Sequence, residues 1–374
     1  MTRMCLEPIY KVKLADVCEI LDNKRIPITA SDRKTGIYPY YGANGVQDYV
    51  DGYIFDEDLV LLAEDGGNFG SKDKPIAYRV SGKCWVNNHA HVLRPLKNID
   101  VDYLCYSLMF YDVNKLVNGA TRKKLNKSEM LKMEVPLLEL EEQRQIVKKI
   151  KRLENIIESR KKQVDLLDLL IKSRFIEMFG DLKLNDKKWE VKFFKDLTLL
   201  ITDGEHSTPR RTDNGIYLLS ARNVLNHSLQ LNDIDYIDEV EYERISKRIQ
   251  PMIGDVLLSC SGSVGRCCAI TKDIKFQMVR SVALLRFKAE INPVFAEYMI
   301  VSDYLQEQIN SNKTASSQSN LFQGKIKMLK GVIPPLDLQN QFADFVEEVN
   351  KSKFTHCYEL LLLIIKKIWY NNYV

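Results

Sequence analysis

A short segment near the middle of the chain reads Val135-Pro136-Leu137-Leu138-Glu139-Leu140-Glu141-Glu142-Gln143. It returns 198 positions later as Ile333-Pro334-Pro335-Leu336-Asp337-Leu338-Gln339-Asn340-Gln341. Upstream, Asp58-Leu59-Val60-Leu61-Leu62 matches Gly254-Asp255-Val256-Leu257-Leu258 at a spacing of 196, and Ala90-His91-Val92-Leu93-Arg94 matches Val282-Ala283-Leu284-Leu285-Arg286 at 192. Ordered matches with small drifts in spacing indicate a tandem duplication of roughly 180–200 residues. Chance similarity between apolar strands is the alternative.

Each copy runs through the same order of elements. The copies open alike, at 12–17 and 191–197, and continue with a mixed Gly- and Tyr-rich portion. The apolar runs 60–63 and 256–259 predict buried strands. The prolines favour an extended approach to a long helical stretch that we expect to begin at Glu139 and at Asp337. The predicted fold class is α+β, with two tandem domains.

The central helical stretch has the clearest periodicity. Apolar residues alternate in steps of four and three, with Arg160 as the one interruption: Ile146, Ile150, Leu153, Ile157, Val164, Leu167 and Ile171. This heptad pattern predicts a coiled-coil interface, and Gly180 is where a helix stop is expected. From Glu142 to Met178 the helix would be about 55 Å long.

A helix of this length needs a partner for its apolar stripe. The second copy offers Phe342, Phe345, Val346, Val349, Phe354, Leu361, Ile364 and Ile368. We therefore expect the two helices to pack antiparallel, with a domain at each end. A coiled coil with another protein chain is the rival interpretation.

Composition sets broad limits. The length of 374 residues suits two or three domains, and 45% hydrophobic with 28% charged residues argues against disorder. The net charge of +4 is weak evidence for a nucleic-acid partner, because many solvated surfaces carry as much.

The eight cysteines form no C-x-x-C pair and the five histidines complete no zinc spacing, so we expect no metal site. His89 and His91 lie in a strand-like run and are expected to serve structure. Scattered cysteines without a signal peptide fit a reducing compartment. The longest apolar run, 360–365, is too short to span a bilayer. We expect a soluble, cytoplasmic protein.

Two copies of one domain on a long helix could meet two stretches of DNA, since sites one helical turn apart lie about 34–36 Å from each other. A duplicated scaffold that binds two proteins is the alternative. In the first copy, the candidate DNA contacts combine aromatic, amide and basic side chains: Arg33, Tyr40, Tyr41, Asn44, Asn68, Lys72, Lys123 and Lys124. A tyrosine-rich turn that packs on its own core is the other interpretation.

In the second copy, the candidate contacts are His206, Thr208, Arg210, Arg211, Arg222, Ser261, Ser263, Arg266 and Gln318. The paired arginines could neutralise phosphates or bind guanine O6 and N7, although a solvated basic turn would have the same composition. Glycine-rich loops at 66–72 and 261–266 could present backbone N–H groups to phosphate. The polar strings 121–126 and 316–321 could contact a duplex or cap the helical region that follows.

In this order, the segments resemble the specificity subunits of Type I restriction-modification systems over essentially the whole chain. The diagnostic strings of the first copy are Tyr38-Pro39-Tyr40-Tyr41-Gly42-Ala43, Phe55-Asp56 and Glu64-Asp65-Gly66. Those of the second copy are Asp203-Gly204-Glu205-His206-Ser207-Thr208-Pro209 and Gly254-Asp255-Val256-Leu257-Leu258-Ser259. The proline-to-glutamine element that heads each long helix is also typical.

The resemblance implies two target-recognition domains, at 1–138 and 182–336, and two long spacer helices, at 139–181 and 337–374, that form an antiparallel coiled coil. The continuous apolar run 360–365 departs from a simple stripe and leaves the register of the second helix open. The resemblance also implies recognition of a bipartite DNA site. Its implied partners are double-stranded DNA, two methyltransferase (modification) subunits and restriction subunits, with no membrane.

No catalytic residue and no cofactor of the chain's own are expected. The resemblance assigns S-adenosylmethionine, ATP and magnesium to the partner subunits. The sequence contains neither a Walker A motif nor an Asn/Asp-Pro-Pro-Tyr/Phe string. An enzyme whose motifs have drifted and a protein-only scaffold are the competing hypotheses. Cofactor binding would favour the enzyme, and DNA binding with bipartite specificity would eliminate the scaffold.

Overall fold

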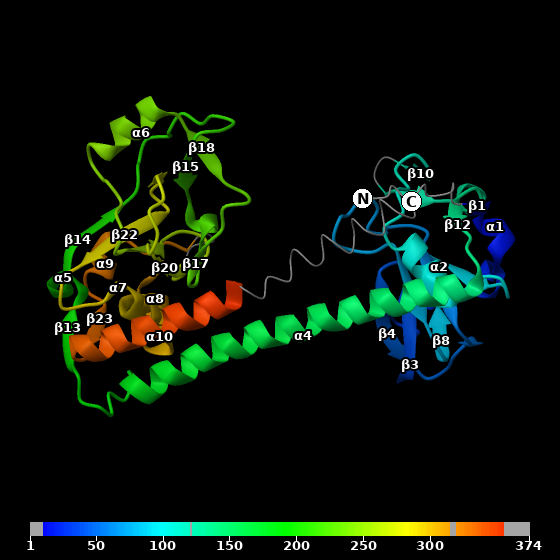
Figure 1. Cartoon of the computed structure of the whole chain (residues 1–374), viewed down its shortest axis with the longest axis horizontal. Helices are drawn as coiled ribbons and strands as arrows, with labels where there is room; N and C mark the ends of the chain where they lie inside the picture. The colour runs from blue at the N-terminus through cyan, green and yellow to red at the C-terminus, as the bar shows by residue number, and fades with distance from the viewer. Residues whose placement is uncertain (1–9, 120–121, 315–318, 355–374) are drawn as a thin grey trace, which may run out of the picture. The chain divides into compact units, whose positions relative to one another are not determined.

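The structure, a computed structural model, describes residues 10–119, 122–314 and 319–354. These residues fall into two compact units, 10–161 and 162–354 (Figure 1). The division falls inside the longest helix. The four-part domain division proposed from the sequence therefore stays a prediction.

The core of the first unit is an antiparallel sheet in the order β2-β9-β6-β7. Its central strand β6 is buried at every position, as the apolar run 60–63 predicts. Helix α2 packs on this sheet and caps its own N-terminus with the Asp100 carboxylate. The bounds are β2 Cys18–Ile20, β6 Leu59–Ala63, β7 Ala77–Val80, β9 Ala90–Pro95 and α2 Val101–Leu108.

A second sheet in this unit has the order β4-β3-β8-β5, in which β3 and β8 run parallel. Two short antiparallel pairs, β1-β12 and β10-β11, complete the strands described for this unit. The bounds of the strands are β1 Lys11–Lys13, β3 Thr35–Gly42, β4 Gly45–Val50, β5 Phe55–Asp56, β8 Lys83–Val86, β10 Val117–Asn118, β11 Lys124–Leu125 and β12 Glu134–Pro136. Short helical turns are α1 Leu14–Val17, η1 Asp22–Lys24 and α3 Lys127–Met130.

The second unit repeats the core sheet as β14-β22-β19-β20. Beside it lie the sheet β18-β15-β21, whose β15 and β21 run parallel, and the pairs β13-β23 and β16-β17. The strand bounds are β13 Glu190–Phe193, β14 Thr198–Asp203, β15 Ile216–Leu219, β16 Val224–Leu225, β17 Ser228–Leu229, β18 Asp235–Ile237, β19 Asp255–Ser259, β20 Cys267–Ala269, β21 Phe276–Met278, β22 Val282–Phe287 and β23 Lys330–Ile333. The helices are α5 Phe194–Leu197, η2 Ala221–Asn223, α6 Glu239–Ser246, α7 Pro293–Val301, α8 Asp303–Asn312 and α9 Gln323–Ile326.

The strand registers confirm the duplication residue by residue. In the first core sheet Leu61 faces Val92, and in the second Leu257 faces Leu284. The spacings between these equivalent positions are 196 and 192, as in the sequence matches. The repeated sequence therefore forms the same sheet twice, and each copy buries its own apolar core.

The predicted central helix is α4, Leu140–Phe179, one uninterrupted helix of 40 residues. It ends at Gly180, whose φ of +76° is a conformation that glycine adopts without strain. Its C-terminal part packs against α10, Leu336–Phe354, in the second unit (Figure 1). Phe175 and Phe179 of α4 contact Phe342 at the start of α10.

The two helices run antiparallel where both are described. Further along α10, Lys353 forms an ion pair at 2.5 Å with Asp168, which precedes Phe175 on α4. Val346 and Val349 of α10 are buried in the same core as Ile171 of α4. The predicted packing partners Leu361, Ile364 and Ile368 lie outside the described residues. The apolar stripe of α4 does not pack on α10 along its whole length, because Ile146 packs on the core of the first unit.

A buried glutamine fixes the start of each long helix. The amide of Gln143 donates to the carbonyls of Asn98 (3.0 Å) and Leu138 (2.8 Å), and its oxygen accepts from the Asp100 N–H (2.8 Å). In the second unit, Gln339 bonds in the same way to three equivalent backbone groups: Glu290 O (3.1 Å), Pro334 O (2.8 Å) and Asn292 N (2.8 Å). Both side chains are fully buried.

This finding corrects the alignment of the two copies. The sequence match equates Gln143 with Gln341, but the hydrogen bonds equate it with Gln339, a spacing of 196 instead of 198. Pairing Pro136 with Pro334 gives the wrong spacing, because Pro136 belongs to strand β12 whereas Pro334 follows strand β23. The match therefore aligned a strand position with a position beyond the strand.

Replacement of Gln143 by alanine should destabilise the chain by roughly 2–4 kcal/mol, because it leaves buried backbone groups without partners. Urea-induced unfolding of the full chain measures this. Gln145→Ala is the matched control, since Gln145 is exposed on the same helix. Equal effects of the two substitutions would contradict a structural role for the buried amide.

Candidate nucleic-acid interface

The loops that follow the central strands β6 and β19 lie against the polar strings predicted as candidates. Gly66 and Gly262 occupy equivalent positions with φ of +61° and +72°, which favour glycine. The Gly66 N–H donates to the Lys123 carbonyl at 3.3 Å, and the Gly262 N–H donates to the Ser319 carbonyl at 3.2 Å. In each unit the fold thus brings together two segments that lie far apart in the sequence.

In the first unit this loop cluster gathers three of the predicted residues. The Asn44 amide donates to the Gly66 carbonyl at 2.9 Å, while Lys123 and Lys124 lie on the adjoining string. Lys124 forms an ion pair with Glu64 at 3.0 Å. All three predicted residues are exposed.

Arg122 joins this cluster; it belongs to the predicted polar string 121–126 but was not singled out there as a contact residue. It lies 3.0 Å from the Asp65 carboxylate and is exposed. The sequence marks the basic run 122–124 as a possible contact, and the fold places that run beside the glycine loop.

The prediction that Tyr40 contacts DNA is wrong. Its side chain is 1% exposed, the Arg33 guanidinium covers its ring at 4.4 Å, and its hydroxyl accepts from the Ile28 N–H. A ring enclosed in this way is unable to stack on a base, so Tyr40 supports the loop instead. Arg33 itself is half-buried and pairs with Asp48 at 3.4 Å.

The remaining candidates of the first unit are spread out. Tyr41 is half-buried and packs against Tyr78. The Asn68 amide donates to the Pro75 carbonyl at 3.3 Å and so holds its own loop. Lys72 is exposed in the same loop, between β6 and β7.

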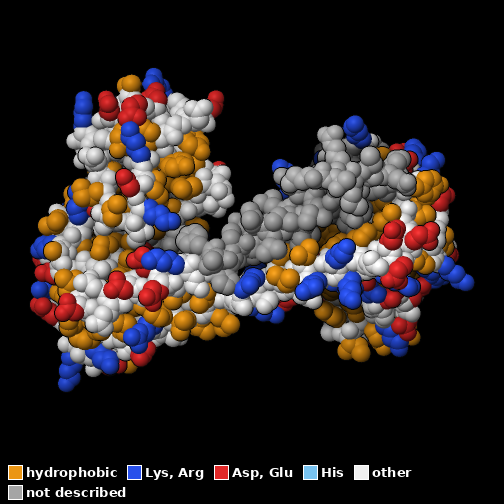
Figure 2. All heavy atoms as spheres, in the orientation of Figure 1, with side chains coloured by type: hydrophobic (Ala, Val, Ile, Leu, Met, Phe, Trp, Pro, Cys, Tyr) orange, Lys and Arg blue, Asp and Glu red, His pale blue; other side chains and the backbone are white. Residues whose placement is uncertain are grey.

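In the second unit the candidate arginines Arg210, Arg211 and Arg222 are paired with carboxylates of the β18–α6 region. Arg210 pairs with Asp238, Arg211 with Asp235 at 3.1 Å, and Arg222 with Asp235 at 3.2 Å. Exposed ion pairs are weak in water, so a phosphate or a base edge can replace the carboxylate. Figure 2 shows basic and acidic side chains intermixed on the visible face of this unit.

Polar contacts hold the loop between β14 and β15 in place. His206 lies 2.9 Å from the Asp203 carboxylate, and both His206 and Thr208 are exposed. Arg248, which was not a predicted contact, donates to the Gly204 carbonyl at 2.7 Å. Nothing in the local sequence links Arg248 to this loop.

The serine candidates follow β19. The Ser259 hydroxyl donates to the Ser263 carbonyl at 2.6 Å and accepts from the Arg266 N–H at 2.9 Å, which closes the loop. Ser261 pairs with Asn320 in an isolated bridge. Gln318 lies outside the described residues.

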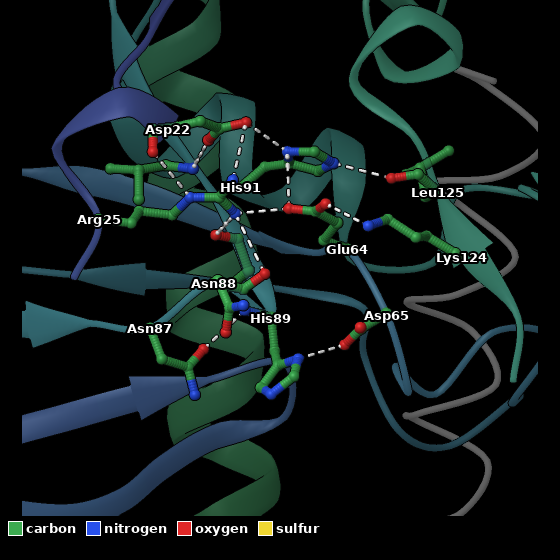
Figure 3. A network of polar contacts seen from close by, with 12 residues as sticks. Asp22, Arg25, Glu64, Asp65, Asn87, Asn88, His89, His91, Lys124 and Leu125 are labelled. Carbon is green, nitrogen blue, oxygen red and sulfur yellow. Dashed lines mark hydrogen bonds and ion pairs between the residues drawn. The ribbon is translucent and has the colours of Figure 1, made fainter. Parts of the chain in front are cut away.

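Beneath the loops of the first unit lies a buried network of charged side chains (Figure 3). Both ring nitrogens of His91 face oxygens, Nδ1 facing Asp22 at 2.6 Å and Nε2 facing the Leu125 carbonyl at 2.8 Å. Arg25 lies 2.5 Å from Glu64, whose other oxygen pairs with Lys124.

Two carboxyl groups of this network stay ionised despite their burial. Desolvation raises the pKa of Glu64, but hydrogen bonds from Arg25 and Lys124 outweigh it and lower the pKa overall. The pKa of Asp22 is also lowered, because hydrogen bonds from His91 and the Val92 N–H and nearby positive charge outweigh desolvation.

Among the described residues, Asp22, Glu64 and His91 form a group whose ligand atoms lie close enough to hold a metal ion, within 4.8 Å of one another. No spacing pattern in the sequence indicates this group, because its three residues lie far apart in the chain. Arg25 and Lys124 already neutralise the carboxylates, and the second nitrogen of His91 is bound to Leu125. A cation therefore does not fit the donor set as it stands.

Two copies of one α+β unit, each with a cluster of basic, amide and hydroxyl side chains in its loops, define a duplicated recognition protein. The sequence pattern of the Type I restriction modification DNA specificity domain matches residues 7–166 and 186–356. The chain belongs to this family.

The chain is similar to two specificity subunits over most of their length. A putative type I restriction enzyme specificity subunit of Haemophilus influenzae is 25% identical over 353 residues, which cover 90% of this chain and 86% of the relative. The type I restriction enzyme MjaVIII specificity subunit of Methanocaldococcus jannaschii is 22% identical over 370 residues, with 91% and 85% covered.

Solved structures show the same fold. The S subunit of a Type I restriction-modification system from M. genitalium matches with a TM-score of 0.61 at 12% identity, covering 100% of this chain and 98% of that one. A chain from a study of complex assembly and conformational transition in the type I R-M system matches with a TM-score of 0.51 at 15% identity, covering 97% and 98%.

Within 10–119, 122–314 and 319–354, no helix combines the length and the apolar composition that crossing a membrane requires.

Substitution of Glu64 by glutamine should give a pH-dependent loss of stability. Because the folded pKa is lowered, ionised Glu64 stabilises the fold above its ordinary pKa of 4.5, and this contribution disappears as the pH falls through the folded pKa. The difference in unfolding free energy between the wild type and Glu64→Gln should therefore be largest near neutral pH and narrow in acid. Denaturant unfolding across the pH range tests this, with exposed Glu134→Gln as the control. A difference that is constant with pH would contradict the assignment.

Proposed function

We propose that each unit recognises one half of a bipartite DNA site and that the chain brings modification and restriction subunits to that site. The observation that carries the proposal is the duplicated core sheet, which presents equivalent loops with different side chains. Unit one offers Asn44, Lys123 and Lys124, whereas unit two offers hydroxyl groups and paired arginines. Equivalent frames with different loops would recognise different half-sequences.

The exposed basic and amide groups would contact the duplex. Lys123, Lys124 and Arg122 suit phosphates, and Arg210 and Arg211 suit phosphates or guanine edges, as does the half-buried Arg266. The carboxylates that now pair with Arg122, Arg210 and Arg211 would hold these side chains in place before DNA binds. Tyr40 and Asn68 would support the loops from behind.

Helix α4 offers a surface for the partner subunits. Leu166, Leu169, Leu170 and Ile176 are between 47% and 63% exposed, although they are large apolar side chains. They recur at helical spacing outside the stripe that packs on α10. We assign this surface to a modification subunit, and the proposed stoichiometry is two such subunits, with restriction subunits joining them.

The proposed chain is not itself catalytic and binds no cofactor of its own. S-adenosylmethionine, ATP and magnesium would belong to the partner subunits. This is supported by the family of the chain and by the lack of nucleotide-binding and methyltransferase strings in its sequence.

Single-molecule methylome sequencing tests the proposed function. A host that carries this chain with its neighbouring modification subunit should contain a methylated split motif that disappears when this chain is deleted. The matched control keeps the chain and deletes the modification subunit. An unchanged methylome with both proteins present would refute the proposal and favour a protein-only scaffold.

Alanine at Arg210 and Arg211 together should weaken binding to one half-site by about 1–3 kcal/mol for each guanine that the two arginines bind. The reciprocal variant Lys123→Ala should weaken the other half-site and reduce the salt dependence by about one unit of slope. Affinities for duplexes with one half-site scrambled measure both effects. Equal weakening at the two half-sites would contradict recognition by separate units.

A further inference from the structure

The His91 ring is held between two hydrogen-bond acceptors. The Leu125 carbonyl accepts from Nε2 at 2.8 Å, and the Asp22 carboxylate lies 2.6 Å from Nδ1. A neutral imidazole has only one N–H, so it would leave a lone pair facing one of these oxygens. The pair His91–Asp22 must therefore hold one additional proton.

Asp22 is poorly suited to carry that proton. One carboxylate oxygen accepts from the Val92 N–H at 2.9 Å, and the other lies 3.6 Å from the Arg25 guanidinium. Both contacts favour the ionised carboxylate. The geometry therefore places the proton on His91, as an imidazolium that is 1% exposed.

The second unit shows that the repeated fold forms without this charge. The strand registers equate His91 with Ala283 and Glu64 with Cys260, and both of these residues are buried in an apolar core. Asp203, which lies opposite Ala283, contacts His206 and Gln323 instead. A buried charge that one copy retains and the other lacks points to a role beyond formation of the sheet.

In the first unit, the network joins the segments that carry candidate contacts. Arg25 leads into the loop of Arg33 and donates to the Ala90 carbonyl at 2.8 Å. Glu64 begins the Gly66 loop, and Lys124 belongs to the basic string that precedes Leu125. His91 bonds to Leu125 itself, so the ring ties this string to Asp22 in the η1 turn (Figure 3).

We propose that protonated His91 is a positioning residue that holds the loops of the first unit in the arrangement that binds DNA. The proposal rests on the proposed function. The charged groups that face the ring are Asp22 and Glu64, with Arg25 and Lys124 behind them; His89 pairs separately with Asp65. Loss of the proton removes one of the two hydrogen bonds, so the arrangement weakens as the pH rises.

The test is a pH profile of DNA affinity for the complex of the full chain with its modification subunit. One duplex carries only the first unit's half-site and the other only the second unit's. Affinity for the first should fall by about tenfold more than affinity for the second as the pH rises from about 6 to about 9. Identical profiles for the two duplexes would overturn the proposal.

The variant Asp22→Asn distinguishes the effect of the proton from the effect of the hydrogen bonds. The new amide can still accept from Val92 and can donate to Nδ1 of a neutral His91, while Nε2 continues to donate to Leu125. This variant should bind the first half-site with a flat pH profile. A profile as steep as that of the wild type would overturn the proposal.

His91→Gln should weaken binding to the first half-site by about tenfold at low pH and leave the second half-site unchanged. His227→Gln is the matched control, because His227 also pairs with a buried carboxylate, that of Glu297, but in the second unit. A His227 variant that removes the pH dependence at the first half-site would contradict the assignment. If the complex binds neither half-site, the proposed function itself fails; if it binds both with equal profiles, only the role of His91 fails.

Discussion

The structure depends on a buried glutamine amide that occurs at the equivalent position in both copies. Gln143 and Gln339 each bind three backbone groups at the point where a recognition unit meets a long helix. A buried amide with all its partners satisfied sets the direction in which the helix leaves the unit, because any other direction would leave those groups unpaired. The sheet, the helix cap on α2 or α7, and the long helix are thereby fixed together in both copies.

On this common frame the two copies differ in the side chains that lie beneath the equivalent loops. The first unit holds charged side chains beneath its loops, where the second packs Cys260 and Ala283. The second unit has Arg210, Arg211 and Arg222 at its surface, in ion pairs with acidic residues of the β18–α6 region. Buried charged side chains thus lie beneath the loops of the first unit, whereas the candidate arginines of the second unit form ion pairs at the surface.

Much of the fold was predictable because it depends on local and periodic signals. Apolar runs predicted the strands β6 and β19, the heptad spacing predicted α4, and Gly180 marked its end. The candidate contacts were less predictable, since residue type alone does not reveal exposure or partners. Tyr40 looked suitable for stacking, but Arg33 covers its ring and Ile28 bonds to its hydroxyl. Arg122 lies in a predicted polar string, but its partner Asp65 comes from a distant loop.

The sequence by itself determined the duplication, the order of elements in each copy and the membership of the family, because these follow from patterns along the chain. Tertiary structure alone decided which glutamine of the second copy matches Gln143, which carboxylate faces each arginine and where the imidazole of His91 lies. Such facts depend on distances between residues that are far apart in the chain. Those distances are set by strand register and packing, which a residue's own neighbours in sequence do not specify.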